Sequence, residues 1–568
     1  GGSNESSQKE PVLSSSNEYE MMINLLESII KDDDLDDQEK LVTSPSLYET
    51  WHQLVISIIS LDTTYISEEL ASKILLWSVS SSTSSPSNHR LATKRRVDEW
   101  IMAYIMSKCN VTRKRKKTTT KQSGDNTPSK RTMTMVMMYQ PTTVAALEKL
   151  LLAYVVSPLM VSNNSNDRPN DTADDEIGDE VMRAMAWQTI ARVVETHGWK
   201  VWTKKIPQQQ QQKETETPLS SKPPIVTWAQ LAAGEWKIQL EQDLSEPSTE
   251  PSSSSVVVAN ESPINNGNSN NREIILDGCS RLLMNVVEYL IGLDERPDQL
   301  QLLSKNNSTA SVPADYHTSL KLLQESLEAT LHTSSEYINV IHERDEQQDG
   351  RTVLSVRMDS KLLVVVSLWS RLFAETDVLS MDNSSRTEII KCLKVQLDWG
   401  SEITRSSCIG GDSDGNGDGD GKDASFAMFV LTLLPALTQF LTMLDADVTS
   451  QRKMASIVEH NVLPFIDNVW TMLADRGQSE FWLIDNGGDS ITWACTSVDI
   501  LGSMTVLSSS TTTTHLESFE RKMIEVMKSC IDLHNNINNK VRRILEQESY
   551  FSKTAAVQSP TSSNHHST

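Results

Sequence analysis

The stretch VVVSLWSRLFAETDVLS, residues 364–380, decides the fold class because its apolar residues recur three and four positions apart. This spacing places them on one side of an α-helix. Together with one residue just before the stretch, they form a stripe of Leu362, Val365, Val366, Trp369, Leu372 and Phe373. A stripe this wide is too apolar for a helix alone in water, so we expect other helices to cover it.

Further apolar stretches with helical periodicity occur along the whole chain. They cover residues 18–31, 46–61, 66–79, 97–108, 142–156, 181–202, 227–242, 274–293, 316–341, 388–397, 424–444, 454–473, 491–507 and 515–545. The 568 residues include only 21 Gly and 19 Pro, so the chain lacks the breakers that β-rich folds require. Helices that cannot bury their apolar faces alone form a continuous core when they stack. The sequence therefore predicts an all-α fold of stacked helix pairs without a strict repeat period.

Tracts rich in Ser, Thr, Asn and Gln separate these helices. Their composition is too polar to bury enough apolar surface for folding. We expect an N-terminal helical part over 1–160 and a second helical part over 181–545. The predicted disordered segments are a basic loop at 111–131, insertions at 206–224, 246–271 and 408–423, and a tail at 551–568.

The net charge indicates which kinds of partner the chain can bind, and the cysteines indicate the redox state of its cellular compartment. The formal net charge is −24, which disfavours binding to nucleic acid. The six cysteines are scattered, without any CxxC pair, and most lie in apolar helical stretches. Free cysteines in such positions behave as small core residues and are typical of a reducing compartment. We therefore expect a cytoplasmic protein.

One uncharged stretch, FAMFVLTLLPALTQFLTML at 426–444, has the length of a membrane span. It contains polar residues and a proline, including Thr432, Pro435 and Gln439, and polar groups are costly in hydrocarbon. A helix buried in the protein core is favoured over a transmembrane helix.

A basic cluster interrupts the acidic chain. Its residues are Arg113, Lys114, Arg115, Lys116, Lys117, Lys130 and Arg131. Such a cluster is a nuclear import signal, a contact to nucleic acid or acidic lipid, or a solvated loop. No aromatic residues alternate with the charges, which disfavours stacking on single-stranded nucleic acid. The solvated loop is favoured, with nuclear import as the alternative, so the location is cytoplasmic or also nuclear.

The loop DSDGNGDGDGKD at 412–423 resembles the calcium loop of an EF-hand. Its candidate Ca²⁺ ligands are Asp412, Asp414, Asn416, Asp418 and Asp423, with Gly417 at the sharp turn. Two positions depart from the pattern: Gly419 replaces an apolar anchor, and Asp423 is shorter than the usual bidentate Glu. A flexible acidic linker is favoured over weak Ca²⁺ binding, which remains the only metal or cofactor interpretation.

Catalytic motifs are absent from the sequence. There is no GxSxG, no HExxH, and the histidines are dispersed. The helical spacing of the tryptophans predicts core packing over exposed binding hot spots; this set is Trp187, Trp199, Trp202, Trp228, Trp236, Trp369, Trp470 and Trp493. We expect a protein that is not an enzyme.

Six segments, taken in order, carry a resemblance to one family. They are AWQTIARVVETHGWKVW (186–202), TWAQLAAGEWKIQLEQ (227–242), ILDGCSRLLMNVVEYLIGL (275–293), SLWSRLFAETDVL (367–379), LTLLPALTQFL (431–441) and IVEHNVLPFIDNVWTML (457–473). In this order they resemble the neurochondrin family over roughly 181–510, and the last segment is similar to an armadillo repeat helix pair. The long Gln, Ser, Asn and Asp-Gly tracts depart from the family, and residues 1–160 match it only in helical character.

The resemblance implies a right-handed α-solenoid of degenerate armadillo/HEAT-like helix pairs. It also implies a cytosolic scaffold or adaptor that binds other proteins, in signalling or trafficking, without catalytic residues. Two alternatives from the residues stay open: a Ca²⁺-responsive regulator that uses loop 412–423, and a solenoid carrier whose import signal lies within 113–131.

Overall fold

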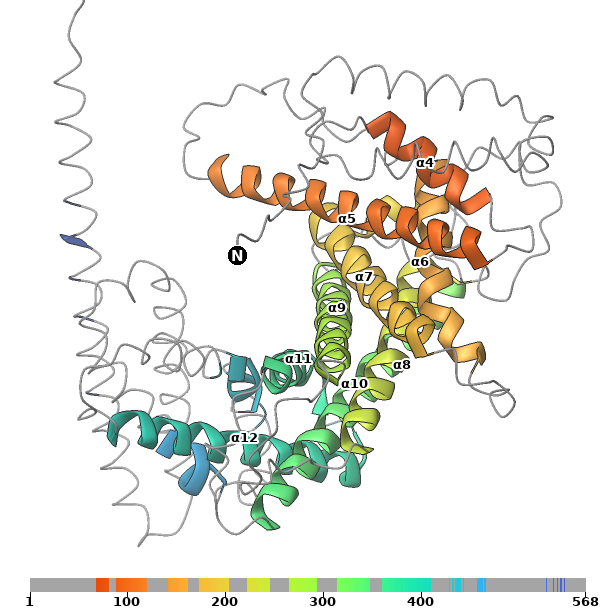
Figure 1. Cartoon of the computed structure of the whole chain (residues 1–568). Coiled ribbons are helices and arrows are strands. Elements are labelled where there is room, and N and C mark those ends of the chain that lie inside the picture. The colour runs from red at the N-terminus through yellow and green to blue at the C-terminus, as the bar shows by residue number, and fades with distance from the viewer. Residues whose placement is uncertain are drawn as a thin grey trace, which may run out of the picture. The chain divides into compact units, whose positions relative to one another are not determined.

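The computed structural model describes residues 68–80, 88–119, 141–161, 173–203, 222–245, 265–293, 314–347, 360–378 and 381–409, with shorter pieces within 429–465 and isolated positions within 528–546. Nearly all of these residues are helical, and none lies in a strand (Figure 1). The predicted all-α class is confirmed for this part of the chain. The chain divides into two compact units: unit 1 contains residues 1–236 and 249–323, and unit 2 contains 237–248 and 324–568.

Unit 1 consists of helices packed side by side. They are α4 (Glu68–Ser80), α5 (Asn88–Thr119), α6 (Pro141–Val161), α7 (Ala173–His197), the 3-10 helix η4 (Trp199–Thr203), α8 (Pro224–Ser245) as far as Trp236, and α9 (Asn265–Ile291). Helix α4 packs on α5 and α6, and α7 packs on α5, α6 and α9 (Figure 1). Each of these pairs joins α-helices that are one or two places apart along the chain.

Tryptophans from consecutive elements form the centre of unit 1. Trp187 of α7 meets Trp228 of α8 edge to face with ring centroids 6.2 Å apart, and Trp202 of η4 lies 6.3 Å from Trp228. Burying rings of this size supplies a large share of the hydrophobic stabilisation. The core prediction is confirmed for the six described tryptophans of the predicted set, Trp187, Trp199, Trp202, Trp228, Trp236 and Trp369. Trp470 and Trp493 lie outside the described residues.

Gly198 ends α7 and turns the chain into η4. Its φ is +72°, a conformation that costs little only for glycine. Its N–H donates to the Val194 carbonyl at 2.7 Å, which satisfies one of the free carbonyls at the end of the helix. Gly198 therefore closes α7 in the left-handed conformation.

Helices α7 and α9 approach closely because Gly278 has no side chain. A Cβ at this position would lie 2.9 Å from both the backbone carbon and the Cβ of Trp187. By contrast, a Cβ at Gly234 in α8 would meet nothing within 4 Å. The two glycines therefore have different reasons to be present, since only Gly278 is required by packing.

We expect Gly278→Ala to lower the free energy of unfolding by about 1–3 kcal/mol, because the added methyl group pushes α9 away from the Trp187 backbone. Gly234→Ala is the matched control and should raise the stability by about 0.5–1 kcal/mol, because alanine is the better helix former. Urea unfolding of the full chain measures both values. Equal effects of the two substitutions would contradict the close contact between α7 and α9.

Unit 2 contains the helix with the apolar stripe from Leu362 to Phe373. Its elements are α8 from Lys237, α10 (Ala314–Gln347) from Gln324, α11 (Ser360–Glu375), α12 (Asn383–Ile409) and the π-helical turn η10 (Val458–Val462), which packs on α12. The α11 stripe is buried from Val365 to Phe373, while Leu362 is half-buried. Trp369 Nε1 donates to Ser335 Oγ of α10 at 2.7 Å, so α11 packs against α10 as the amphipathic pattern requires.

The stretch 426–444 is described only in pieces. Phe429, Leu433, Leu437 and Phe440 are buried, and a Cβ at Gly400 of α12 would approach the Phe429 ring at 3.4 Å. These residues therefore pack against protein. Among the described helices, none combines the length and the apolar composition that crossing a bilayer requires.

Several predicted segment boundaries need correction. Helix α5 continues to Thr119, so the first part of the stretch 111–131, predicted as a loop, is helical. Lysine and arginine are good helix formers, and they extend a helix that starts in a packed region. Helix α9 begins at Asn265, inside the predicted insertion 246–271. Asn271 is buried there, so packing overrides the poor helix propensity of asparagine. Helix α12 likewise reaches Ile409, two residues into the predicted insertion 408–423.

Candidate functional site

Most of the residues that the sequence singled out lie outside the described part of the structure. The loop 412–423, with all five candidate Ca²⁺ ligands, lies outside the described residues, as do Lys130 and Arg131. Arg113–Lys117 belong to α5, but their side chains are also outside the described part. The candidate site is therefore built from residues that the structure itself places in contact.

The described thiols are poor candidates for chemistry. Cys109, Cys279 and Cys392 are free and buried, as expected for small core residues. Cys109 Sγ lies 4.0 Å from His197 Nε2, a pairing that resembles a nucleophile and its base. However, burial raises the pKa of Cys109 to about 11, so the thiol is neutral at pH 7. A neutral buried thiol is not a nucleophile.

A polar junction in unit 2 fixes α10 against α8 and α11. Asp243, near the end of α8, accepts hydrogen bonds from Tyr337 Oη of α10 at 2.6 Å and from Lys361 Nζ of α11. Arg344 of α10 donates to the Leu244 carbonyl at 2.6 Å, which satisfies a free carbonyl at the end of α8. The Asp243 carboxylate thus accepts hydrogen bonds from both α10 and α11.

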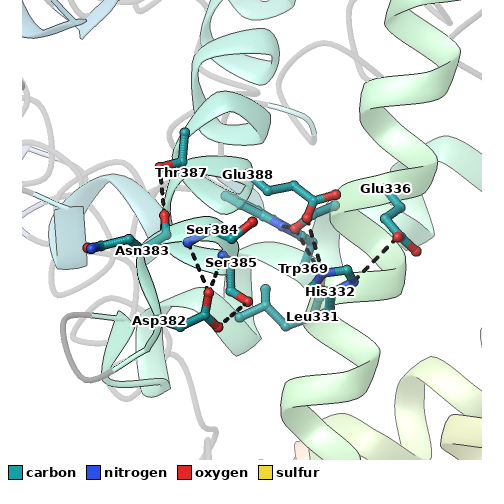
Figure 2. Close-up of polar contacts among 11 residues, drawn as sticks. Leu331, His332, Glu336, Trp369, Asp382, Asn383, Ser384, Ser385, Thr387 and Glu388 are labelled. Atoms are coloured by element: carbon teal, nitrogen blue, oxygen red, sulfur yellow. Dashed lines mark hydrogen bonds and ion pairs between the residues drawn. The ribbon is translucent and has the colours of Figure 1, made fainter.

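Helix α12 begins at a well-formed cap that sets the position of its first turns. Asp382 Oδ1 accepts from the backbone N–H of Ser384 at 2.9 Å and of Ser385 at 3.1 Å, as an N-cap residue does. Hydrogen bonds from the Ser385 hydroxyl and N–H lower the pKa of Asp382. Figure 2 shows this cap below Glu388, which lies farther along the same helix.

Beside this cap, a histidine and two glutamates from α10 and α12 converge. His332 and Glu336 lie one helical turn apart on α10, with His332 Nδ1 at 3.7 Å from Glu336 Oε1. Glu388 reaches across from α12, with its Oε2 at 3.1 Å from His332 Nε2 (Figure 2). One ligand-type atom from each of the three side chains lies within 4.8 Å of the others. The side chains of His332, Glu336 and Glu388 are 41%, 54% and 30% exposed, so solvent and ions reach the cluster.

A second ion pair joins α10 and α12. It lies one turn after Glu388 on α12 and two turns after Glu336 on α10. Lys391 Nζ of α12 donates to Glu343 Oε1 of α10 at 2.7 Å, and this hydrogen bond lowers the pKa of Glu343. Both side chains are about half exposed. The pair holds one cation and one anion and has no imidazole, so it offers a natural comparison for the His332 cluster.

The dispersed histidines do not by themselves single out His332. The spacing of His332 and Glu336 on a predicted helix is a signal for a shared site, because residues four apart lie on the same helix face. Glu388 had no such signal, because its approach depends on how α12 packs against α10.

Comparison with known proteins gives no neighbour for this chain. No protein-family model, no curated protein and no solved structure matches it.

Proposed function

We propose that this chain is a non-catalytic scaffold or adaptor that binds other proteins in the cytoplasm, built as an α-solenoid of the neurochondrin-like, armadillo/HEAT type. The observation that carries the proposal is the order of helix packing. In unit 1, α4 contacts α5 and α6, and α7 contacts α5, α6 and α9. Packing between helices one or two places apart is what a stacked repeat array requires.

Unit 2 supports the proposal with the same order of contacts. Helix α10 meets α11 through Trp369 and Ser335, and it meets the end of α8 through Tyr337 and Asp243. It meets α12 through the contacts of Glu343 and His332. An array of this kind presents long rows of side chains to a partner, which suits it to protein binding.

Helix α10 gives an example of such a row. Its residues Gln324, Glu325 and Glu328 lie at helical spacing, and each is exposed or half-buried. The tryptophans whose burial the structure describes, Trp187 and Trp369 among them, lie in the core and are not available as binding hot spots. Recognition by this row would use charge and hydrogen bonds, which favour specificity and fast association.

Affinity capture with the tagged full chain, followed by quantitative mass spectrometry, tests the proposal. We expect a small set of proteins to co-purify in constant ratio with the wild-type chain and with Gly234→Ala, whose new methyl group meets nothing. Gly278→Leu should lose the same proteins, because its side chain cannot fit against Trp187 and separates α7 from α9.

Two results would count against a scaffold. One is a wild-type chain that captures nothing beyond the tag alone. The other is an identical set of proteins with wild type and Gly278→Leu, provided that circular dichroism shows the variant to have lost helix. In that case binding would come from segments that need no folded array.

A further inference from the structure

We propose that His332, Glu336 and Glu388 form a binding site for a divalent transition-metal ion, Zn²⁺ being the ion that the ligand set fits best. The site would join α10 to α12 in unit 2. This inference goes beyond the scaffold function and does not depend on it, because it rests on three side chains and not on a partner.

The distances suit a metal ion with little rearrangement. Zn²⁺ bonds of about 2.0–2.2 Å to nitrogen and oxygen place tetrahedral ligand atoms roughly 3.3–3.5 Å apart. His332 Nε2 and Glu388 Oε2 are 3.1 Å apart, and one carboxylate oxygen of Glu336 completes a set within 4.8 Å. Glu336 is the most exposed of the three, so a small rotation of its side chain closes the remaining gap.

The chemistry of the three groups selects the class of ion. An imidazole with two carboxylates is a mixed nitrogen and oxygen set, which favours Zn²⁺ and its neighbours in the first transition row. Ca²⁺ and Mg²⁺ take oxygen ligands and would gain little from His332. Water would fill the fourth position, because three protein ligands leave one open.

The surrounding contacts hold the two ends of the site in place. On α10, Ser335 is buried beside His332 and accepts from Trp369, which fixes this turn against α11. On α12, the Asp382 cap fixes the first turn, below Glu388. Two carboxylates facing one imidazole give the site a net charge of −2 when His332 is neutral, and this charge attracts a cation.

Isothermal titration calorimetry of the full chain with ZnCl₂ tests the site. His565 and His566, adjacent in the sequence, are replaced by alanine in every sample so that they do not compete for the ion. We expect one Zn²⁺ to bind with an affinity that falls by about tenfold or more on removal of any ligand, since even an outer partner of a metal ligand is worth 10- to 100-fold. His332→Ala should weaken binding most, while Glu388→Gln keeps the weaker pair on α10.

The controls remove the same residue types from the same helix. His317→Ala takes away an exposed histidine of α10, and Glu343→Gln takes away the carboxylate that pairs with Lys391. Neither should change Zn²⁺ affinity. All of these side chains are at least partly exposed, and unchanged melting without metal checks that the variants fold. Zn²⁺ binding that is equal in wild type, His332→Ala and Glu388→Gln would overturn the site and leave a surface ion pair only.

A second readout separates a bridging ion from one held by α10 alone. Zn²⁺ should slow amide hydrogen exchange in both α10 and the start of α12 in the wild-type chain. In Glu388→Gln this protection should be lost from α12. Protection confined to α10 in the wild type would refute the bridge between the two helices.

Discussion

Replacing Glu235 by alanine should lower the free energy of unfolding by about 3–5 kcal/mol, the cost of leaving one member of a buried ion pair alone. Glu235 of α8 pairs with Arg183 of α7, and the two side chains are only 3% and 11% exposed. The Arg183 Nε already finds no hydrogen-bond partner among the described residues. Without Glu235, the charged guanidinium would stay in the apolar contact between α7 and α8 with little water around it.

Chemical denaturation of the full chain measures this loss, and α8 itself supplies the control. Glu241 pairs with Lys237 at 3.6 Å where both side chains are about 60% exposed. Glu241→Ala should cost no more than about 0.5 kcal/mol, the usual value for an exposed pair four residues apart. If Glu235→Ala costs as little as Glu241→Ala, the α7–α8 contact is more hydrated than the structure indicates.

The double substitution Arg183→Met with Glu235→Leu distinguishes two causes of this loss, an uncompensated charge and a missing contact. Apolar residues of similar volume in place of a buried ion pair are often neutral or stabilising. We therefore expect the double variant to recover most of the stability that Glu235→Ala loses. Recovery would show that the loss comes from an uncompensated charge and not from a missing contact.

The second large effect is expected at Asp98, a fully buried carboxylate of α5. It accepts from Tyr154 Oη of α6 at 2.6 Å, from Lys94 Nζ of its own helix at 2.7 Å, and from the Ser78 hydroxyl of α4. Asp98→Ala would remove the acceptor that these three donors share and should cost about 3–5 kcal/mol. Because three helices share the carboxylate, α4, α5 and α6 should all lose protection from amide hydrogen exchange.

Tyr154→Phe is the comparison for Asp98→Ala. It removes one donor and leaves the carboxylate its other two, so the expected loss is about 1.5–3 kcal/mol, that of a single hydrogen bond to a charged group. Burial and the nearby Asp98 charge raise the pKa of Tyr154, so its hydroxyl remains a donor at all ordinary pH values. A Tyr154→Phe loss as large as that of Asp98→Ala would mean that the other two donors contribute nothing.

The sequence predicts the helices of this chain well where one face is strongly apolar. The α11 stripe and the tryptophans of α7 and α8 are buried as their spacing indicates. Gly198 is also predictable, because a glycine after the last apolar residue of a helix is a common end. These features depend on residues within a few turns of one another.

What the sequence does not predict depends on packing between distant segments. The bounds of α5 and α9 extend into polar stretches, because propensity and tertiary contacts carry the helix beyond its apolar face. The acceptors Asp98 and Asp243 look like ordinary surface residues until the helices that supply their donors are placed. For the same reason, Glu388 gives no local sign that it meets His332.

The position of Asp243 couples two helices of unit 2 to a single side chain. One carboxylate at the end of α8 ties down α10 through Tyr337 and α11 through Lys361. A substitution that removes this carboxylate therefore loosens α10 and α11 at the same time, while Arg344 still holds α10 to the Leu244 carbonyl and Trp369 still joins α11 to α10.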